Sequence, residues 1–153
     1  MRDEERKAVH AATLSLERAQ QIIHGALQKS RETGCDPLSV AVLDAGGHLV
    51  AFMRQDGSGI LRPQIAIAKA YGALGFGAGS RELKEKNPLF LNAVAMASWG
   101  RMIPAPGGVL IRSVETGQIM GAVGISGDTA DKDEAAAIAG VELNGWRADA
   151  GRA

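Results

Sequence analysis

Two pairs of short β-rich runs constrain this chain most strongly. The first pair is LSVAVLD at 38–44 and LVAFMRQ at 49–55, and the glycines Gly46-Gly47 stand between them. A Gly-Gly step between two such runs is typical of a β-hairpin. The second pair is GVLIRS at 108–113 and QIMGAVGIS at 118–126, joined by VETG. Because hairpins pair antiparallel, the chain is expected to build an antiparallel sheet.

Helical patterns flank and separate these hairpins. In the first helix Leu16, Ala19 and Ile23 recur with helical spacing, and Gly34 stands where a helix would end. The order is α-ββ-ααα-ββ-α, which predicts one sheet with helices packed on it. A short extra strand near 101–104 is compatible with this order. The helices are expected at 14–33, 63–79, 81–85, 88–99 and 129–147.

Composition narrows the class of protein. The chain of 153 residues carries 17 basic and 17 acidic side chains, so its net charge is zero and no nucleic-acid or anionic-membrane partner is indicated. No apolar run is long enough to span a membrane. A single cysteine and a charged N-terminus without a signal-peptide pattern favour the cytoplasm. We expect one domain over 12–148, a flexible N-terminal tail at 1–11 and a C-terminal tail at 149–153.

The glycine-rich stretch GAVGISGDTADKDEAAAIAG at 121–140 resembles a phosphate loop only superficially. It has neither the P-loop nor the dinucleotide spacing, and the acids that open the next helix would repel a phosphate. We interpret it as a turn in which Asp128 or Thr129 caps the helix. Ala122, Gly124 and Ser126 share one strand face and are all small, so a helix or a ligand can approach closely there.

Four ordered motifs resemble the GlcG/HbpS-like haem-binding family, also called the haem-degrading domain family. This domain also forms the C-terminus of PduO-type cobalamin adenosyltransferases. The resemblance extends over roughly residues 12–145. The motifs are LSVAVLDAGGHLVAFMRQDG (38–57), IAIAKAYGAL (65–74), PAPGGVLIR (104–112) and GAVGISGDTADKDEAAAIAG (121–140).

The resemblance implies an α/β (α+β) profilin-like domain, with a five-stranded antiparallel sheet flanked by helices on both sides, that assembles into dimers or larger oligomers. Its members are haem or corrinoid binders, and at least one is a cofactor-free lyase. Haem is therefore the candidate cofactor.

His24 is the candidate haem ligand, because in some haem-binding relatives a histidine on the first helix ligates iron. An ordinary surface histidine is the alternative, since His24 lies on the polar side of its helix. His48 is expected at the hairpin and His10 in the N-terminal tail. The histidines lack zinc-site spacing, so no metal-ion site is predicted.

Three cations form a second candidate site. Arg62 and Lys69 are seven residues apart on one helix face, and Arg54 closes a strand just before Asp56. Together they could clamp a substrate carboxylate. Ordinary ion pairing is the alternative, for example Arg54 with Asp56 or Lys69 with an acid of the last helix.

The PAPGG loop at 104–108 is a third candidate. Backbone N–H groups of Gly107 and Gly108 could meet a ligand oxygen, and Arg101 could join a pocket rim. A rigid connection into the next strand is the alternative.

Two functions follow from these sites. The first is an oligomeric protein that binds a small ligand, haem or a related tetrapyrrole. The second is a cofactor-independent lyase or isomerase acting on a small carboxylated, aromatic metabolite, with Asp56 or Glu134 as the acid/base. An accessory protein of a catabolic pathway, without catalysis of its own, is a third interpretation.

Overall fold

The computed structural model describes residues 13–152. The N-terminal tail expected at 1–11, with His10, lies outside the described residues. The elements in chain order are α2 (Leu16–Thr33), β1 (Ser39–Asp44), β2 (Leu49–Arg54), α3 (Arg62–Phe76), the 3₁₀ helix η1 (Ser80–Glu85), α4 (Pro88–Ala97), β3 (Gly108–Arg112), β4 (Ile119–Ser126), α5 (Ala130–Glu142) and β5 (Arg147–Asp149).

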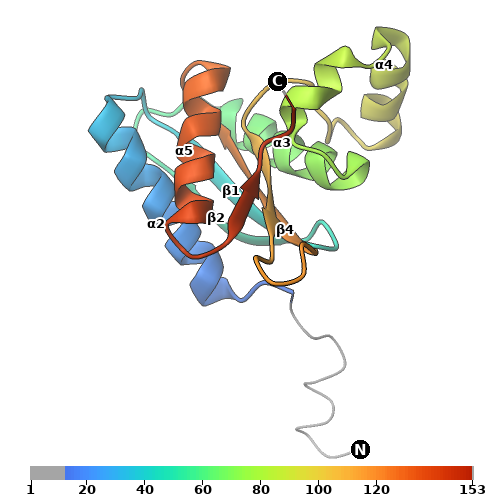
Figure 1. The fold of residues 1–153 in the computed structure, drawn as a ribbon. Helices are drawn as coiled ribbons and strands as arrows, with labels where there is room; N and C mark the ends of the chain where they lie inside the picture. Colours follow the sequence, from blue (N-terminus) through green and yellow to red (C-terminus); the bar gives the residue numbers. More distant parts are fainter. Residues whose placement is uncertain (1–12, 153) are drawn as a thin grey trace, which may run out of the picture.

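The predicted antiparallel sheet is confirmed. Its five strands lie in the order β2-β1-β4-β3-β5, and both expected hairpins, β1–β2 and β3–β4, are present. Helices α2 and α5 lie side by side on one face of the sheet, and α3 covers the other face (Figure 1). The α4 helix packs beside the end of α3. This α+β arrangement of a single sheet between helices is consistent with the profilin-like fold.

The fifth strand differs from the expected place. Residues 101–104 form no strand, and the edge beside β3 is instead taken by β5. Arg112 Nε donates to Asp149 Oδ2 at 2.8 Å across this pair. The last helix also ends earlier than expected, at Glu142, and Gly145 then adopts a left-handed φ of 79° that turns the chain back to the sheet. Trp146 therefore lies outside the helix, and β5 includes the first residue of the predicted C-terminal tail.

The inner strand β1 is buried on both faces. Val40 and Val42 pack in the core beneath α2 and α5, whereas Leu43 packs beneath α3 with Ala70. Burying such aliphatic side chains contributes roughly 1.5–3 kcal/mol each. The core between the sheet and the α2–α5 pair is therefore the main source of stability.

The small face of β4 lets a helix approach. A Cβ atom built on Gly124 would overlap the carbonyl oxygen of Ala66 and lie 2.9 Å from the backbone nitrogen of Ala70, both on α3. Of the two predicted occupants of this face, a helix or a ligand, the helix is the one observed. The α3 backbone consequently lies directly on the sheet.

The glycine-rich turn before α5 has a structural role. Thr129 is the N-cap, and its hydroxyl accepts from the Lys132 N–H. The Asp128 carboxylate accepts from the N–H groups of Asp36 at 2.7 Å and Thr129 at 2.6 Å. These backbone hydrogen bonds lower the pKa of Asp128. The turn is therefore held by its own side chains, as expected for a capped helix.

Candidate functional site

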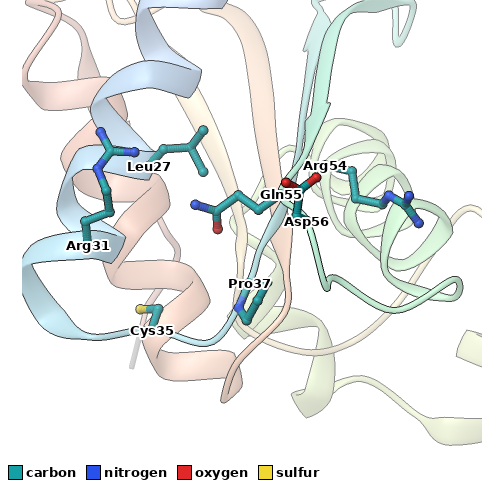
Figure 2. A pocket seen from close by; sticks show the side chains of 7 residues that line it. All are labelled: Leu27, Arg31, Cys35, Pro37, Arg54, Gln55 and Asp56. Atoms are coloured by element: carbon teal, nitrogen blue, oxygen red, sulfur yellow. The ribbon is translucent and has the colours of Figure 1, made fainter.

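A pocket of about 510 Å³ lies between the end of α2 and the end of β2. Figure 2 shows the Leu27, Arg31 and Gln55 side chains together on one side of it, while the Arg54 guanidinium points away from them. Arg31 is thus the cation on the α2 side of this pocket, and Asp56 lies between the two arginines. The lining residues are Leu27, Arg31, Cys35, Pro37, Arg54, Gln55 and Asp56.

His24 lies on α2, exposed, on the same helical face as Leu27 and Arg31. The neighbouring Ile23 points into the core, so the helix holds the imidazole outward. Strand β2 packs against α2, and the register Val40↔Met53 places Met53 on the α2 side of the sheet. Met53 is 40% exposed. The accessible His24 imidazole, the partly exposed Met53 and the Arg31 guanidinium therefore lie on the α2 and β2 elements that pack against each other.

His48, in contrast, is engaged at the hairpin. Its Nδ1 lies 3.0 Å from Asp44 Oδ1, and its backbone N–H also donates to that oxygen at 2.9 Å. Within residues 13–152, no cluster of histidine, cysteine and acidic side chains could hold a metal ion. No helix in this same range is long and apolar enough to cross a membrane.

Lys69 forms a buried ion pair. It is only 3% exposed, and its amine donates to Asp133 Oδ2 at 3.2 Å and to the carbonyl of Ile125 at 2.9 Å. Burial lowers the pKa of Lys69 and raises that of Asp133, because it disfavours the charged form of each. From the sequence, Lys69 is either part of a carboxylate clamp or half of an ion pair with an acid of the last helix. The structure shows the ion pair.

Arg54 and Arg62 lie on either side of a buried serine. In the register of the sheet, Ser39 pairs with Arg54 on one side and with Ser126 on the other. Arg62 Nη1 donates to Ser126 Oγ at 3.2 Å. Across the described part of the chain, neither arginine has an ion-pair partner within 4 Å. Two of the three predicted cations thus remain open to an anion.

The two candidate acid/base residues have different surroundings. Asp56 is exposed in the loop after β2. Glu134 is 8% exposed and binds Arg81 through both oxygens, with Arg81 Nε 3.0 Å from Oε2 and Nη2 3.0 Å from Oε1. Such a bidentate pair favours the ionised carboxylate. The role of Glu134 seen in the structure is to join α5 to η1.

The PAPGG loop packs tightly into the fold. The Gly108 N–H donates to Ser80 Oγ at 2.7 Å, and the Gly107 carbonyl accepts from the Ile125 N–H at 3.0 Å. A Cβ on Gly108 would overlap the carbonyl oxygen of Lys69. The Gly108 N–H is therefore already used within the protein, and the loop is a rigid connection into β3.

Sequence reasoning missed a second cavity, of about 290 Å³, between α3 and α4. Its walls are mainly apolar, and Arg101 is among its lining residues, whereas the sequence had suggested Arg101 only beside the PAPGG loop. The signal in the sequence was the pair Gly72 and Gly75, which removes side chains from one face of α3. The lining residues are Tyr71, Gly72, Gly75, Phe76, Val94, Ser98, Arg101 and Met102.

Comparison with known proteins identifies the family. Residues 14–142 match the family model described as "Haem degrading protein HbpS-like". The chain belongs to this HbpS-like family. The expectation from the four sequence motifs is confirmed, and haem is a reasonable candidate cofactor for a member of this family.

Similar proteins support this assignment. An uncharacterized 15.0 kDa protein from the dhaT-dhaS intergenic region of Citrobacter freundii is 26% identical over 129 residues, or 83% of this chain and 89% of that protein. The crystal structure of HbpS superposes with a TM-score of 0.74 at 26% identity and covers 94% of this chain and 96% of that one. The PduOC:heme complex has a TM-score of 0.78, 21% identity and coverage of 89% and 97%, and it shows the shared fold.

The α2–β2 surface fits the chemistry of a tetrapyrrole. Neutral imidazole is a common axial ligand of haem iron. The exposed Met53 offers apolar contact to a macrocycle, and Arg31 can bind a propionate.

Proposed function

We propose that this protein binds haem or a related tetrapyrrole on the surface between α2 and β2, with His24 as the residue that would hold the metal. The observation that carries the proposal is the position of His24, which shares one helical face with Leu27 and Arg31 of the 510 Å³ pocket. Membership of the HbpS-like haem degrading family supports it. Bound haem would supply an iron centre for redox chemistry.

Each residue of this surface has a distinct role in the proposal. The unprotonated ring nitrogen of the His24 imidazole would donate its lone pair to the metal. Met53 excludes water from part of the macrocycle, since it is apolar and only partly covered by the fold, while the buried Leu27 forms the floor of the pocket beneath it. The Arg31 guanidinium orients the ligand through a propionate carboxylate. Arg54 is not part of this set, because its side chain points away (Figure 2).

The first test is a haem titration followed by absorbance. The parent protein should give a saturable Soret shift at micromolar haem. His24→Ala removes the ligand, so haem affinity should fall by at least about 10-fold to 100-fold, the loss already caused by removing a residue that only supports a metal ligand. His48→Ala is the matched control, because His48 is also an exposed histidine but is engaged with Asp44. Equal titrations of the parent and His24→Ala would contradict the assignment of His24.

A second candidate function, a cofactor-independent lyase or isomerase for a small carboxylated metabolite, rests on a different observation. Arg54 and Arg62 flank Ser39 without a carboxylate partner in the described chain. They could hold a substrate carboxylate, with the exposed Asp56 nearby as the acid/base. Under this alternative Arg62→Ala would remove substrate binding and leave the haem titration unchanged.

We further propose that the protein self-associates through α4. This helix carries no charged residue, and Leu89, Ala93 and Met96 share its exposed face. Leu89 is 79% and Met96 is 83% exposed, and Trp99 just beyond the helix is 88% exposed. Interface cores are poor in charge and rich in aromatic residues and methionine. A twofold contact lets this same surface serve both copies.

Introducing a charge on this helix tests the association. Met96→Glu would bury a carboxylate in an apolar contact, so the oligomer should dissociate to a monomer in light-scattering measurements at micromolar concentration. Gln64→Glu on α3 places the same charge on another exposed helical position and should leave the mass unchanged. An oligomer of unaltered mass in Met96→Glu would exclude α4 as the interface.

A further inference from the structure

We propose that the cavity between α3 and α4 is a separate ligand site that takes a small, flat, apolar carboxylate. It lies against α3, on the opposite face of the sheet from α2 and His24 (Figure 1). Its volume of about 290 Å³ lies just below the range of roughly 300–1,000 Å³ for small-molecule sites. A ligand of one or two rings suits this volume, whereas a tetrapyrrole needs a larger site. The inference is therefore independent of the proposed haem site.

Gly75 keeps this cavity open. It lies in α3 with an ordinary helical backbone, and a Cβ built on it would meet nothing within 4 Å. Gly72, one turn earlier, is different, because its Cβ would lie 3.1 Å from Met102 Cγ. Glycine inside a helix costs about 0.5–1 kcal/mol relative to alanine. No packing contact or backbone angle in the structure requires glycine at position 75, and the space beside it fits a ligand.

The walls of the cavity are flat and apolar. Phe76 contacts Phe90 edge to face, with ring centroids 6.4 Å apart, and Val94 and Met102 pack in the same small cluster. Tyr71 is fixed from the hairpin side, since a Cβ on Gly47 would lie 2.9 Å from its ring. Aromatic and aliphatic walls of this kind favour an apolar ring in the ligand.

Arg101 supplies the charge at the rim. Its Nε donates to the Ser98 carbonyl at 2.9 Å, and its guanidinium lies 4.2 Å from the centroid of the Tyr71 ring. Both contacts hold the guanidinium in place without neutralising it, and its terminal nitrogens have no carboxylate partner in the described chain. A pre-positioned guanidinium binds a carboxylate through paired hydrogen bonds. An apolar cavity with this cation at its mouth therefore selects an apolar body with one anionic end.

Calorimetric titration with naphthoate and its uncharged analogue naphthamide tests the proposal. Naphthoate should bind the full protein with a dissociation constant on the order of 10⁻⁴ M, because a ligand with so few atoms can supply a binding free energy of this size. Naphthamide should bind about tenfold or more weakly, because it cannot form the charged pair with Arg101. Equal affinity for the two probes, or no binding of naphthoate at millimolar concentration, would overturn the proposal.

Two variants locate the binding. Gly75→Leu fills the cavity from an open, exposed position, so naphthoate binding should fall at least about tenfold while the helix gains propensity and the melting temperature does not drop. Arg101→Gln should bring naphthoate to the affinity of naphthamide. Unchanged naphthoate binding in either variant would place the ligand elsewhere.

The controls separate this site from the haem site. Gln64→Leu introduces the same side chain at an exposed position in the first turn of α3 and should bind naphthoate as the parent does. Arg31→Gln should weaken haem binding and leave naphthoate binding unchanged. If the haem titration fails and the naphthoate experiments succeed, the proposed function is refuted and this inference stands. If haem binds as expected and naphthoate does not bind, this inference is refuted and the proposed function stands.

Discussion

Lys69→Met should lower the free energy of unfolding by about 3–5 kcal/mol, the cost of leaving one partner of a buried ion pair alone. Asp133 is 1% exposed and would keep only its backbone hydrogen bonds, among them the Asp128 N–H at 2.9 Å. Burial already raises the pKa of Asp133. The loss of the Lys69 cation removes an interaction that opposes this rise. Urea unfolding at neutral pH measures the effect.

The stability of Lys69→Met should also change with pH in a definite direction. In Lys69→Met the folded protein holds a proton on Asp133 more tightly than the unfolded chain does, so lowering the pH favours the folded state of the variant. Its deficit relative to the parent should therefore shrink as the pH falls through the raised pKa of Asp133. A deficit that grows on acidification would contradict the ion-pair explanation.

Two controls accompany this variant. The double substitution Lys69→Met with Asp133→Asn removes both charges and retains an oxygen for the Asp128 N–H, so it should recover much of the loss. Lys132→Met removes a largely exposed lysine that lies 3.8 Å from Asp128, and it should change the stability by no more than about 1 kcal/mol. Equal losses in Lys69→Met and Lys132→Met would mean that burial of the pair has no energetic importance.

Gly124→Val should destabilise the fold by more than about 3 kcal/mol. The new side chain would meet the backbone of α3 at Ala66 and Ala70, and a helix backbone cannot turn away as a flexible side chain can. Overpacking a core commonly costs about 1–3 kcal/mol, and displacing an entire helix from the sheet costs more. Thermal unfolding followed by circular dichroism is the measurement.

Gly75→Ala is the matched control for Gly124→Val. It also adds a Cβ to a glycine of the α3–β4 layer, but at a position with nothing within 4 Å. We expect it to be neutral or stabilising by up to about 1 kcal/mol. If Gly124→Val unfolded at the temperature of the parent, the close contact between α3 and β4 would be wrong.

Local patterns in the sequence predicted the parts of the fold that local chemistry determines. The Gly46-Gly47 turn, the small face at Ala122 and Gly124, and the capped start of α5 each depend on residues near in sequence or on one strand face. The short β5 strand has only three residues, too few for a periodic signal. Its place is fixed by pairing with β3 and by the contact between Arg112 and Asp149, which are far apart in the chain.

The candidate sites were likewise predictable where they depend on residues near in sequence, and not where they depend on distant contacts. The cation cluster was recognised from spacing, but spacing could not tell which cation would be buried. Lys69 finds its partner because α3 packs on β4 and the first turns of α5 follow directly after that strand, a contact between residues separated by 64 positions. The cavity beside Gly75 was missed because it exists only where α3 and α4 meet, and neither helix shows it alone.

The packing of α2 against α5 has a consequence for how the chain is made. A Cβ on Gly25 would lie 3.2 Å from the Cα of Gly140, so the first described helix fits against the last one. On the ribosome, the apolar side of α2 emerges long before its cover is synthesised, and the outer strand β5 comes later still. Closure between such distant segments is intrinsically slow. The apolar face of α2 therefore cannot be covered during synthesis until α5 has left the exit tunnel.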